Sequence, residues 1–183
     1  MKVEGLNALE KERKVSIFDS RAKRREIFSE VYCTTYEGTF AEYAQAQRHR
    51  MLEYQMRLLE TPKFYVPEII RENEELKKEW LSDIESVKDL YPQGMLISIR
   101  ERGTYEKFIL KCKERLCGAA QLEIALQTEK TLQKYLAEVK ANGEDEIYSY
   151  LLKYAKGTRC TFPHFKCTKP CIWGAKDALK RKI

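Results

Sequence analysis

Two arginines flank a histidine at positions 48 to 50, in the sequence Gln45-Ala46-Gln47-Arg48-His49-Arg50. Guanidinium groups suit phosphates and electron-rich ring edges, because their N–H donors form a planar fork. The alternative is a surface cluster paired with glutamates at helical spacing, such as Glu42, Glu53 or Glu60. Spacing alone favours that alternative, so a ligand site needs support from other segments of the chain.

On a regular helix the polar residues of this segment divide between two faces. Gln45, Arg48 and His49 follow the i, i+3, i+4 spacing and share one face. Arg50 lies about 200° around the helix from Arg48. One ligand in one pocket would not easily touch both arginines, so we expect two ligands or one site at a subunit junction.

The wider pattern predicts a helix-dominated α+β domain with a small sheet. A strand is expected at 30–36, with Gly38 ending it and Thr39 capping the next helix. Four helices are expected, over residues 40–59, 68–90, 104–140 with a break near 118, and 144–155. Helical spacing predicts inward-facing residues in the second and third of them: Ile69, Leu76, Trp80, Ile84 and Val87, and Ala125, Thr128, Leu132, Tyr135 and Val139. Residues 61–67 are expected to form a loop, and 95–99 a short strand or the buried start of a helix.

Length and composition fit one domain with a real core. The chain has 183 residues, of which 43% are hydrophobic and 34% charged. No apolar run approaches the roughly 20 residues that cross a bilayer, and residues 1–14 lack a signal-peptide stretch. We therefore expect a cytoplasmic protein without membrane contact.

The net charge of +6 suits an anionic ligand such as a nucleotide. Basic runs at 21–25 and 180–182 would also suit nucleic acid, although solvated faces are the favoured interpretation.

Six cysteines are expected to be free thiols, because no secretion signal is evident. Three lie in patterned segments and are expected to pack as small hydrophobes: Cys33, Cys112 and Cys117. Four zinc-compatible donors occur near the end: Cys160, His164, Cys167 and Cys171. Their spacing is not that of a well-known zinc finger, so a zinc site remains open while free or packed thiols are favoured.

Four segments, in order along the chain, resemble the flavin-dependent thymidylate synthase family. They are residues 31–50, Phe64-Tyr65-Val66-Pro67, the stretch from Gly103 to Ile124 with Arg115 and an Ala-Gln-x-Glu-Ile run, and Tyr154-Ala155-Lys156-Gly157. The family-like domain would cover residues 29–156. An N-terminal extension of residues 1–28 would precede it, and a cysteine-rich basic tail of residues 157–183 would follow.

The resemblance implies methylation of dUMP, or of a related pyrimidine nucleotide. FAD would be the cofactor, with NADPH and methylenetetrahydrofolate as co-substrates. Such enzymes are homotetramers with active sites shared between subunits, and no enzyme nucleophile is essential. By resemblance, Gln45 and Arg48 would face the nucleotide. The flavin would be held by Arg48, His49, Arg50 and Arg115.

Several positions depart from the family pattern. An acid, a serine and an arginine expected after the triplet are Met56, Leu58 and Glu60 here. The arginine that usually follows the Ala-Gln-x-Glu-Ile run is Ala125, and residues 105–107 supply no nucleotide-contacting arginine. A carboxylate at position 60 would repel a phosphate. Two alternatives to an enzyme therefore stand: a non-catalytic or half-site subunit that joins a more regular paralog, and a basic nucleic-acid-binding module.

Overall fold

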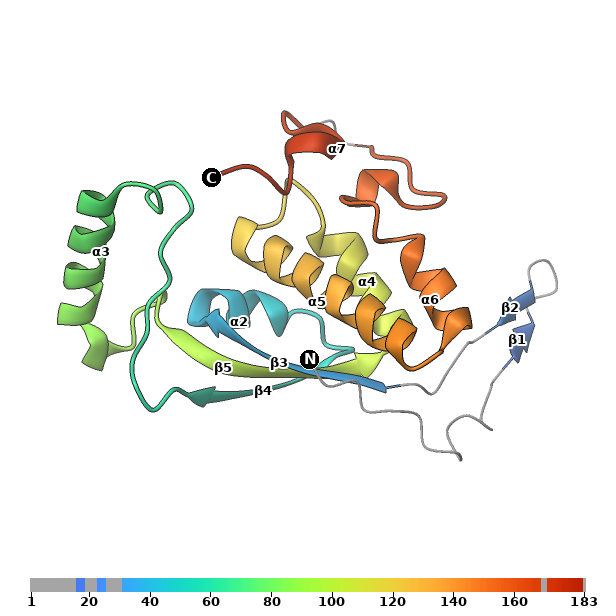
Figure 1. The fold of residues 1–183 in the computed structure, drawn as a ribbon, viewed down its shortest axis with the longest axis horizontal. Coiled ribbons are helices and arrows are strands. Elements are labelled where there is room, and N and C mark those ends of the chain that lie inside the picture. Colours follow the sequence, from blue (N-terminus) through green and yellow to red (C-terminus); the bar gives the residue numbers. More distant parts are fainter. Residues whose placement is uncertain (1–15, 19–22, 26–30, 169–170, 183) are drawn as a thin grey trace.

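The structure, a computed structural model, describes residues 16–18, 23–25, 31–168 and 171–182. Its centre is an antiparallel sheet of three strands with helices on one face (Figure 1). Across the sheet the strands are β3 (Val31–Thr39), β5 (Leu96–Thr104) and β4 (Glu53–Leu58). A separate ribbon consists of β1 (Ser16–Phe18) and β2 (Lys23–Arg25). The predicted α+β class is confirmed, as a small single domain.

Helices α2, α4 and α5 lie over the sheet, and α6 packs beside α5 (Figure 1). The helices are α2 (Phe40–Ala46), α3 (Glu74–Ser86), α4 (Tyr105–Arg115), α5 (Leu122–Ala141), α6 (Asp145–Leu152) and α7 (Gly174–Asp177). Two 3-10 turns are η1 (Lys88–Leu90) and η2 (Arg159–Thr161). The opposite sheet face is not covered by any described helix and carries exposed polar side chains: Thr35, Glu37, Gln55, Arg57 and Arg100.

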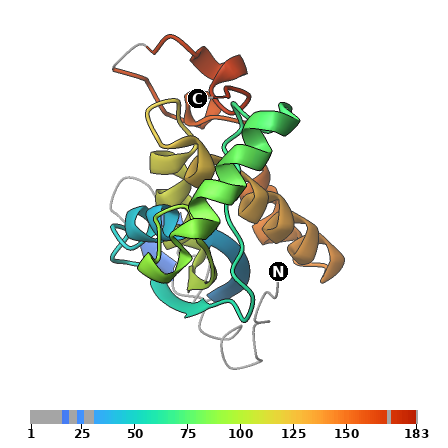
Figure 2. The ribbon, with the colours of Figure 1, turned by 90° about the vertical axis from the view of Figure 1, so that its left-hand side faces the viewer.

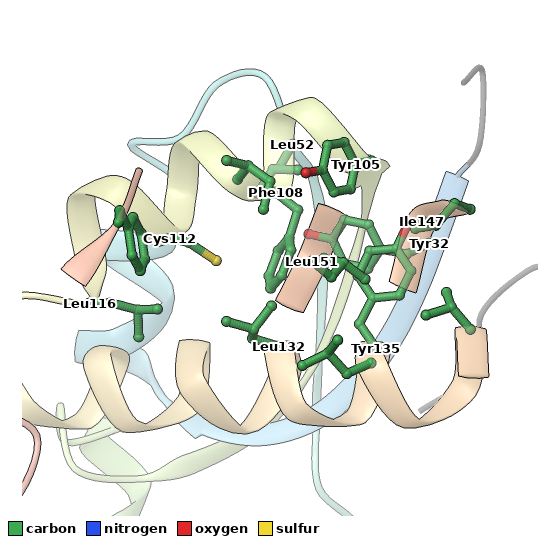
Figure 3. Close-up of a cluster of buried hydrophobic side chains, with 14 residues drawn as sticks. Tyr32, Leu52, Tyr105, Phe108, Cys112, Leu116, Leu132, Tyr135, Ile147 and Leu151 are labelled. Atoms are coloured by element: carbon green, nitrogen blue, oxygen red, sulfur yellow. The ribbon is translucent and has the colours of Figure 1, made fainter. Parts of the chain in front are cut away.

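The sheet and the helices share a cluster of buried side chains (Figure 3). Three aromatic rings form its middle, namely Tyr32 of β3, Phe108 of α4 and Tyr135 of α5. Their centroids are 4.9, 5.4 and 5.8 Å apart. Aromatic pairs at such distances each contribute about 0.5–1.5 kcal/mol beyond their area burial. This cluster therefore fixes α4 and α5 against β3.

A buried ion pair also joins the sheet to α4. Lys111 Nζ lies 2.6 Å from Glu101 Oε2, and both side chains are fully buried. The Tyr32 hydroxyl donates to Glu101 Oε1 at 2.5 Å, and the Tyr36 hydroxyl donates to Oε2 at 3.1 Å. The buried carboxylate is thus satisfied by three donors on β3 and α4, which ties these elements to β5.

The second half of the chain follows the predicted pattern. Helices α4 and α5 fill the predicted helical stretch, with the break between residues 115 and 122. Every residue predicted for the buried side of the longer helix is buried: Ala125, Thr128, Leu132, Tyr135 and Val139. Asn142 caps that helix, and Gly143 has a φ of +71°, which glycine adopts without strain. Residues 95–99 belong to strand β5.

The predicted helix over residues 40–59 is wrong beyond Ala46. The chain turns at residues 47–52 and continues as strand β4. Residues 53–58 alternate polar and apolar side chains, Glu-Tyr-Gln-Met-Arg-Leu, and this period of two also fits a strand. Pairing with β5 decides between the two patterns. Strand β3 likewise continues to Thr39, past the predicted end at Gly38.

The predicted helix over residues 68–90 is shorter than expected. Helix α3 covers only residues 74–86 and lies outside the sheet-and-helix body, in front of it in Figure 2. Of the residues predicted to face inward, Ile84 is buried and Trp80 half-buried. The other three are exposed: Ile69, Leu76 and Val87. The helical spacing was present, but the helix has little core to cover.

Cys33, Cys112, Cys117, Cys160 and Cys171 are free thiols, as predicted. Cys33, Cys112 and Cys117 are buried, which confirms their packing role. Most of the predicted N-terminal extension, including residues 21 and 22 of its basic run, lies outside the described residues. Within the described part of the chain, no helix has the length and apolar character to span a membrane.

Candidate functional site

The Arg48-His49-Arg50 triplet lies in the turn between α2 and β4. His49 N donates to Ala46 O at 3.0 Å, and Leu52 N donates to His49 O at 2.9 Å. The expectation that the triplet occupies a regular helix is therefore wrong, and so is the 200° argument for its arginines. Arg48 and Arg50 are exposed, whereas the His49 side chain is only 9% exposed. The turn thus separates one buried imidazole from two solvent-facing guanidinium groups.

Three of the predicted site residues meet at the end of α2. Arg115 Nε donates to His49 Nε2 at 2.7 Å, and Arg115 Nη2 donates to Gln45 O at 3.4 Å. Arg115 is the last residue of α4 and lies 66 residues after His49 in the sequence. Two separate family-like segments therefore form one cluster, defined here as the histidine–arginine cluster of Gln45, His49 and Arg115.

Two further residues join this cluster and were not predicted as site residues. The Gln45 side-chain amide donates to the side chain of Gln121. Glu114 Oε2 lies 3.7 Å from His49 Nδ1. Gln121 belongs to the Ala-Gln-x-Glu-Ile run, so the family resemblance already indicated the segment in which it lies. Nothing in the sequence indicated Glu114, which is an exposed glutamate on α4 directly before Arg115.

His49 is neutral near pH 7. Burial, followed by the charge of Arg115, lowers the pKa of its imidazole to about 4. A neutral ring can accept the Arg115 N–H at Nε2, whereas an imidazolium would repel it. Burial also lowers the pKa of the Arg115 guanidinium. The cluster accordingly offers one fixed guanidinium, oriented by an uncharged histidine.

The lowered pKa of His49 should make folding sensitive to acid. Between pH 6.5 and pH 4 the unfolded chain takes up a proton at His49, while the folded chain does not, so stability falls with falling pH. We expect a contribution of about 2–3 kcal/mol to this loss. Urea unfolding of the wild type and His49→Asn at pH 4.5, 5.5, 6.5 and 7.5 measures it. Subtracting the unfolding free energies of the two proteins removes the contributions of other titrating groups. If the free energy of unfolding changes with pH equally in both proteins, the lowered pKa of His49 is wrong.

Two of the three glutamates named for the surface-pairing alternative, Glu42 and Glu53, lie in other surroundings. Glu42 is buried, with 1% of its surface exposed. Glu53 Oε2 lies 3.6 Å from Arg102 Nη1.

A pocket of about 470 Å³ lies next to Gln121, within the size range of small-ligand sites. Tyr65 and Pro67 of the family-like loop form one wall, and residues 120–123 form another. The C-terminal tail contributes Trp173 and Arg181. Two family-like segments and the C-terminal tail therefore meet at this pocket.

The basic run at residues 180–182 is engaged within the fold. Arg181 is buried and donates to the carbonyl oxygens of Ala120 and Ala178. Lys182 Nζ lies 3.0 Å from Glu72 Oε2. Arg181 thus holds the tail against the body, whereas Lys180 and Lys182 are exposed, in line with the predicted solvated tail.

No protein-family model matches the sequence. No curated protein matches it significantly either.

The positions that depart from the family pattern lie in two settings. Met56 and Leu58 are on edge strand β4, where they are 41% and 49% exposed. Ala125 is fully buried in α5, so an arginine there would have no space in this packing. The replacement at position 125 is therefore structural here, while those at 56 and 58 leave an apolar strip on an open edge.

The candidate zinc ligands remain a prediction. Cys160, Cys167 and Cys171 are exposed, and His164 has a φ of +58°. Among the residues that the structure describes, no three histidine, cysteine or acidic side chains are gathered as a metal site would require.

Proposed function

We propose that the chain is a diverged flavin-dependent thymidylate synthase-like protein that binds FAD and a pyrimidine nucleotide around the histidine–arginine cluster. The contact of Arg115 with His49 and Gln45 carries this proposal. It unites three of the five residues that the family resemblance assigns to flavin and nucleotide, although Arg115 is distant in the sequence from the other two. The adjoining pocket at Gln121 has the size for part of such a ligand.

The chain's own groups would bind and orient the reactants, while FAD would supply hydride transfer and methylenetetrahydrofolate the carbon unit. Arg115, held by His49, offers N–H donors to an anion or a ring carbonyl. Arg48 and Arg50 are exposed beside it and would reach phosphate groups of the nucleotide or of FAD. NADPH would reduce the flavin. No side chain needs to act as a nucleophile in this scheme.

The second candidate is a half-site subunit within a hetero-oligomer. The exposed Met56 and Leu58 on edge strand β4 favour it, because an apolar strip beside an unpaired strand edge suits another chain. A more regular paralog would then supply the missing acid, hydroxyl and arginine. In a homotetramer the same strip would meet a second copy. Nucleic-acid binding through residues 180–182 is less favoured, because Arg181 and Lys182 already have partners.

Flavin binding by the purified chain tests the proposal. We expect the chain to bind FAD with a Kd below about 10 µM and to show the visible flavin band. Native mass measurement gives the oligomeric state, and titration with dUMP should perturb the flavin spectrum.

A folded oligomer that binds no FAD alone would exclude an independent flavoenzyme. If FAD binding and dTMP formation then appear on mixing with a regular family member, the chain is a half-site subunit. If neither appears, both candidates are wrong.

A further inference from the structure

An acidic groove borders α5 on a chain whose net charge is +6. It has a volume of about 510 Å³ and runs between β3, the loop after residue 61, and α5. Five carboxyl groups line it: Glu37, Glu42, Glu68, Glu123 and Glu129. Tyr65, Leu96 and Leu126 add apolar surface. The lining therefore joins local negative charge to the apolar walls of a small-ligand pocket.

Cations of the chain already pair with two of the outer carboxylates, and a further cation, Lys130, also lines the groove. Lys63 Nζ lies 2.7 Å from Glu37 Oε1, and Arg71 Nη1 lies 2.6 Å from Glu68 Oε1. The inner part of the groove is different, because Glu42 of α2 and Glu123 of α5 are joined there by a side-chain hydrogen bond. These two residues are called the inner pair. A positively charged ligand would therefore be attracted to this inner pair of carboxyl groups.

Glu42, the α2 member of the pair, is incompletely satisfied. It is 1% exposed, and its Oε1 has no hydrogen-bond partner among the described residues. Such a buried unpaired oxygen costs free energy. Glu123, by contrast, accepts from Thr39 N at 3.0 Å and from Thr39 Oγ1 at 2.9 Å. Gly38 makes room for the Glu42 carboxyl, because a Cβ at that position would collide with Oε2.

Near neutral pH Glu42 holds a proton, which it shares with Glu123 through their hydrogen bond. Burial, followed by the charge of Glu123, raises the pKa of Glu42 to about 9. Burial likewise raises the pKa of Glu123. Other titratable groups face Glu42 from each neighbouring strand and helix: Tyr36 of β3, Tyr54 of β4, Glu101 of β5 and Lys111 of α4. Only Lys111 opposes the rise in the Glu42 pKa.

We infer that this groove binds a small organic cation, an ammonium or guanidinium group on a short apolar arm, with the charged end against Glu42 and Glu123. A small shift of the Glu42 side chain toward the groove would let the N–H donors of the cation satisfy Oε1, which is enclosed in the free protein. The charge of the cation would replace the shared proton. That proton leaves the carboxyl O–H and passes to the solvent. An organic cation fits better than a metal ion, because the described residues gather no set of three metal ligands. This site is separate from the histidine–arginine cluster and does not require flavin.

Butylammonium and its uncharged counterpart butyramide serve as probes on the full chain. The Thr39 amide signal in ¹⁵N NMR spectra reports binding, because this amide donates to Glu123. Butylammonium should shift the signal in a saturable way, whereas butyramide should not. Because binding displaces a proton, affinity should rise about tenfold per pH unit between pH 6.5 and 8.5. Calorimetry in two buffers of different ionisation enthalpy should show about one proton released per cation.

A matched pair of variants assigns the effect to the inner pair. Glu42→Gln removes the shared proton at nearly constant size, so it should weaken butylammonium binding about tenfold and abolish the pH dependence. Glu79→Gln, an equal charge change on exposed α3, should leave both unchanged.

Several results would overturn the inference: no saturable shift up to about 50 mM butylammonium, equal binding of butyramide, or binding without pH dependence. If Glu42→Gln does not fold, two measurements on the wild type still test the inference: the comparison of butylammonium with butyramide, and the release of a proton on binding. None of these measurements involves FAD, so this inference and the proposed function can fail separately.

Discussion

Replacing Lys111 by methionine should lower the free energy of unfolding by about 3–5 kcal/mol. The substitution leaves Glu101 without its ammonium partner at a site where both side chains are fully buried. The two tyrosine hydroxyls that remain cannot balance a full negative charge. Urea denaturation followed by circular dichroism measures the loss.

Two further variants separate the ion pair from simple packing. Lys107→Met, one turn earlier on α4 and only half-buried, should change stability by less than about 0.5 kcal/mol. Adding Glu101→Gln to Lys111→Met removes the stranded charge and should recover at least half of the loss. A loss below about 1 kcal/mol in the single variant would show that the pair contributes little.

Replacing Arg115 by lysine should weaken FAD binding about 10- to 100-fold, if the chain binds flavin as proposed. Lysine keeps the positive charge, but its single nitrogen on a flexible arm replaces the two rigidly spaced guanidinium nitrogens that donate to His49 Nε2 and Gln45 O. His49 would then lose the donor that orients it. Quenching of flavin fluorescence during titration measures the affinity, and thermal unfolding confirms that the variant is folded.

Arg57→Lys provides the matched control for this experiment. Arg57 is exposed on the open face of the sheet, away from the histidine–arginine cluster. Its replacement should leave FAD affinity unchanged. Equal losses in both variants would indicate a diffuse electrostatic effect of arginine, and no loss at Arg115 would remove this residue from the site.

The local sequence pattern was sufficient to predict the buried side of a helix where that helix covers a large part of the core. The apolar spacing of α5 identified its buried side correctly, because that face packs on the sheet and on α4 along its whole length. The same spacing misled in α3, which has helical periodicity but only one fully buried residue, Ile84. Periodicity reports a helix, but it does not reveal how much of the protein that helix covers.

Residues 53–58 could not be assigned from local pattern, since their partner is distant. Each pairs with a residue of β5 about 40 to 50 positions away, such as Glu53 with Arg102. Most of these residues are also acceptable in a helix, so tertiary pairing decided the outcome. The same limit applies to the candidate site. The resemblance pointed to His49 and Arg115 separately, while Glu42 and Glu114 gained a role only from the fold.

The order of strands across the sheet has a consequence for synthesis on the ribosome. Strand β5 lies between β3 and β4 but is the last of the three along the chain. Neither earlier strand can hydrogen-bond in the native register until residues 96–104 have emerged. Folding should therefore be governed by contacts of high sequence separation and be slow for a chain of this size. Until β5 is available, β3 and β4 are nascent segments with unpaired backbone, and a chaperone that binds extended apolar stretches would act at this stage.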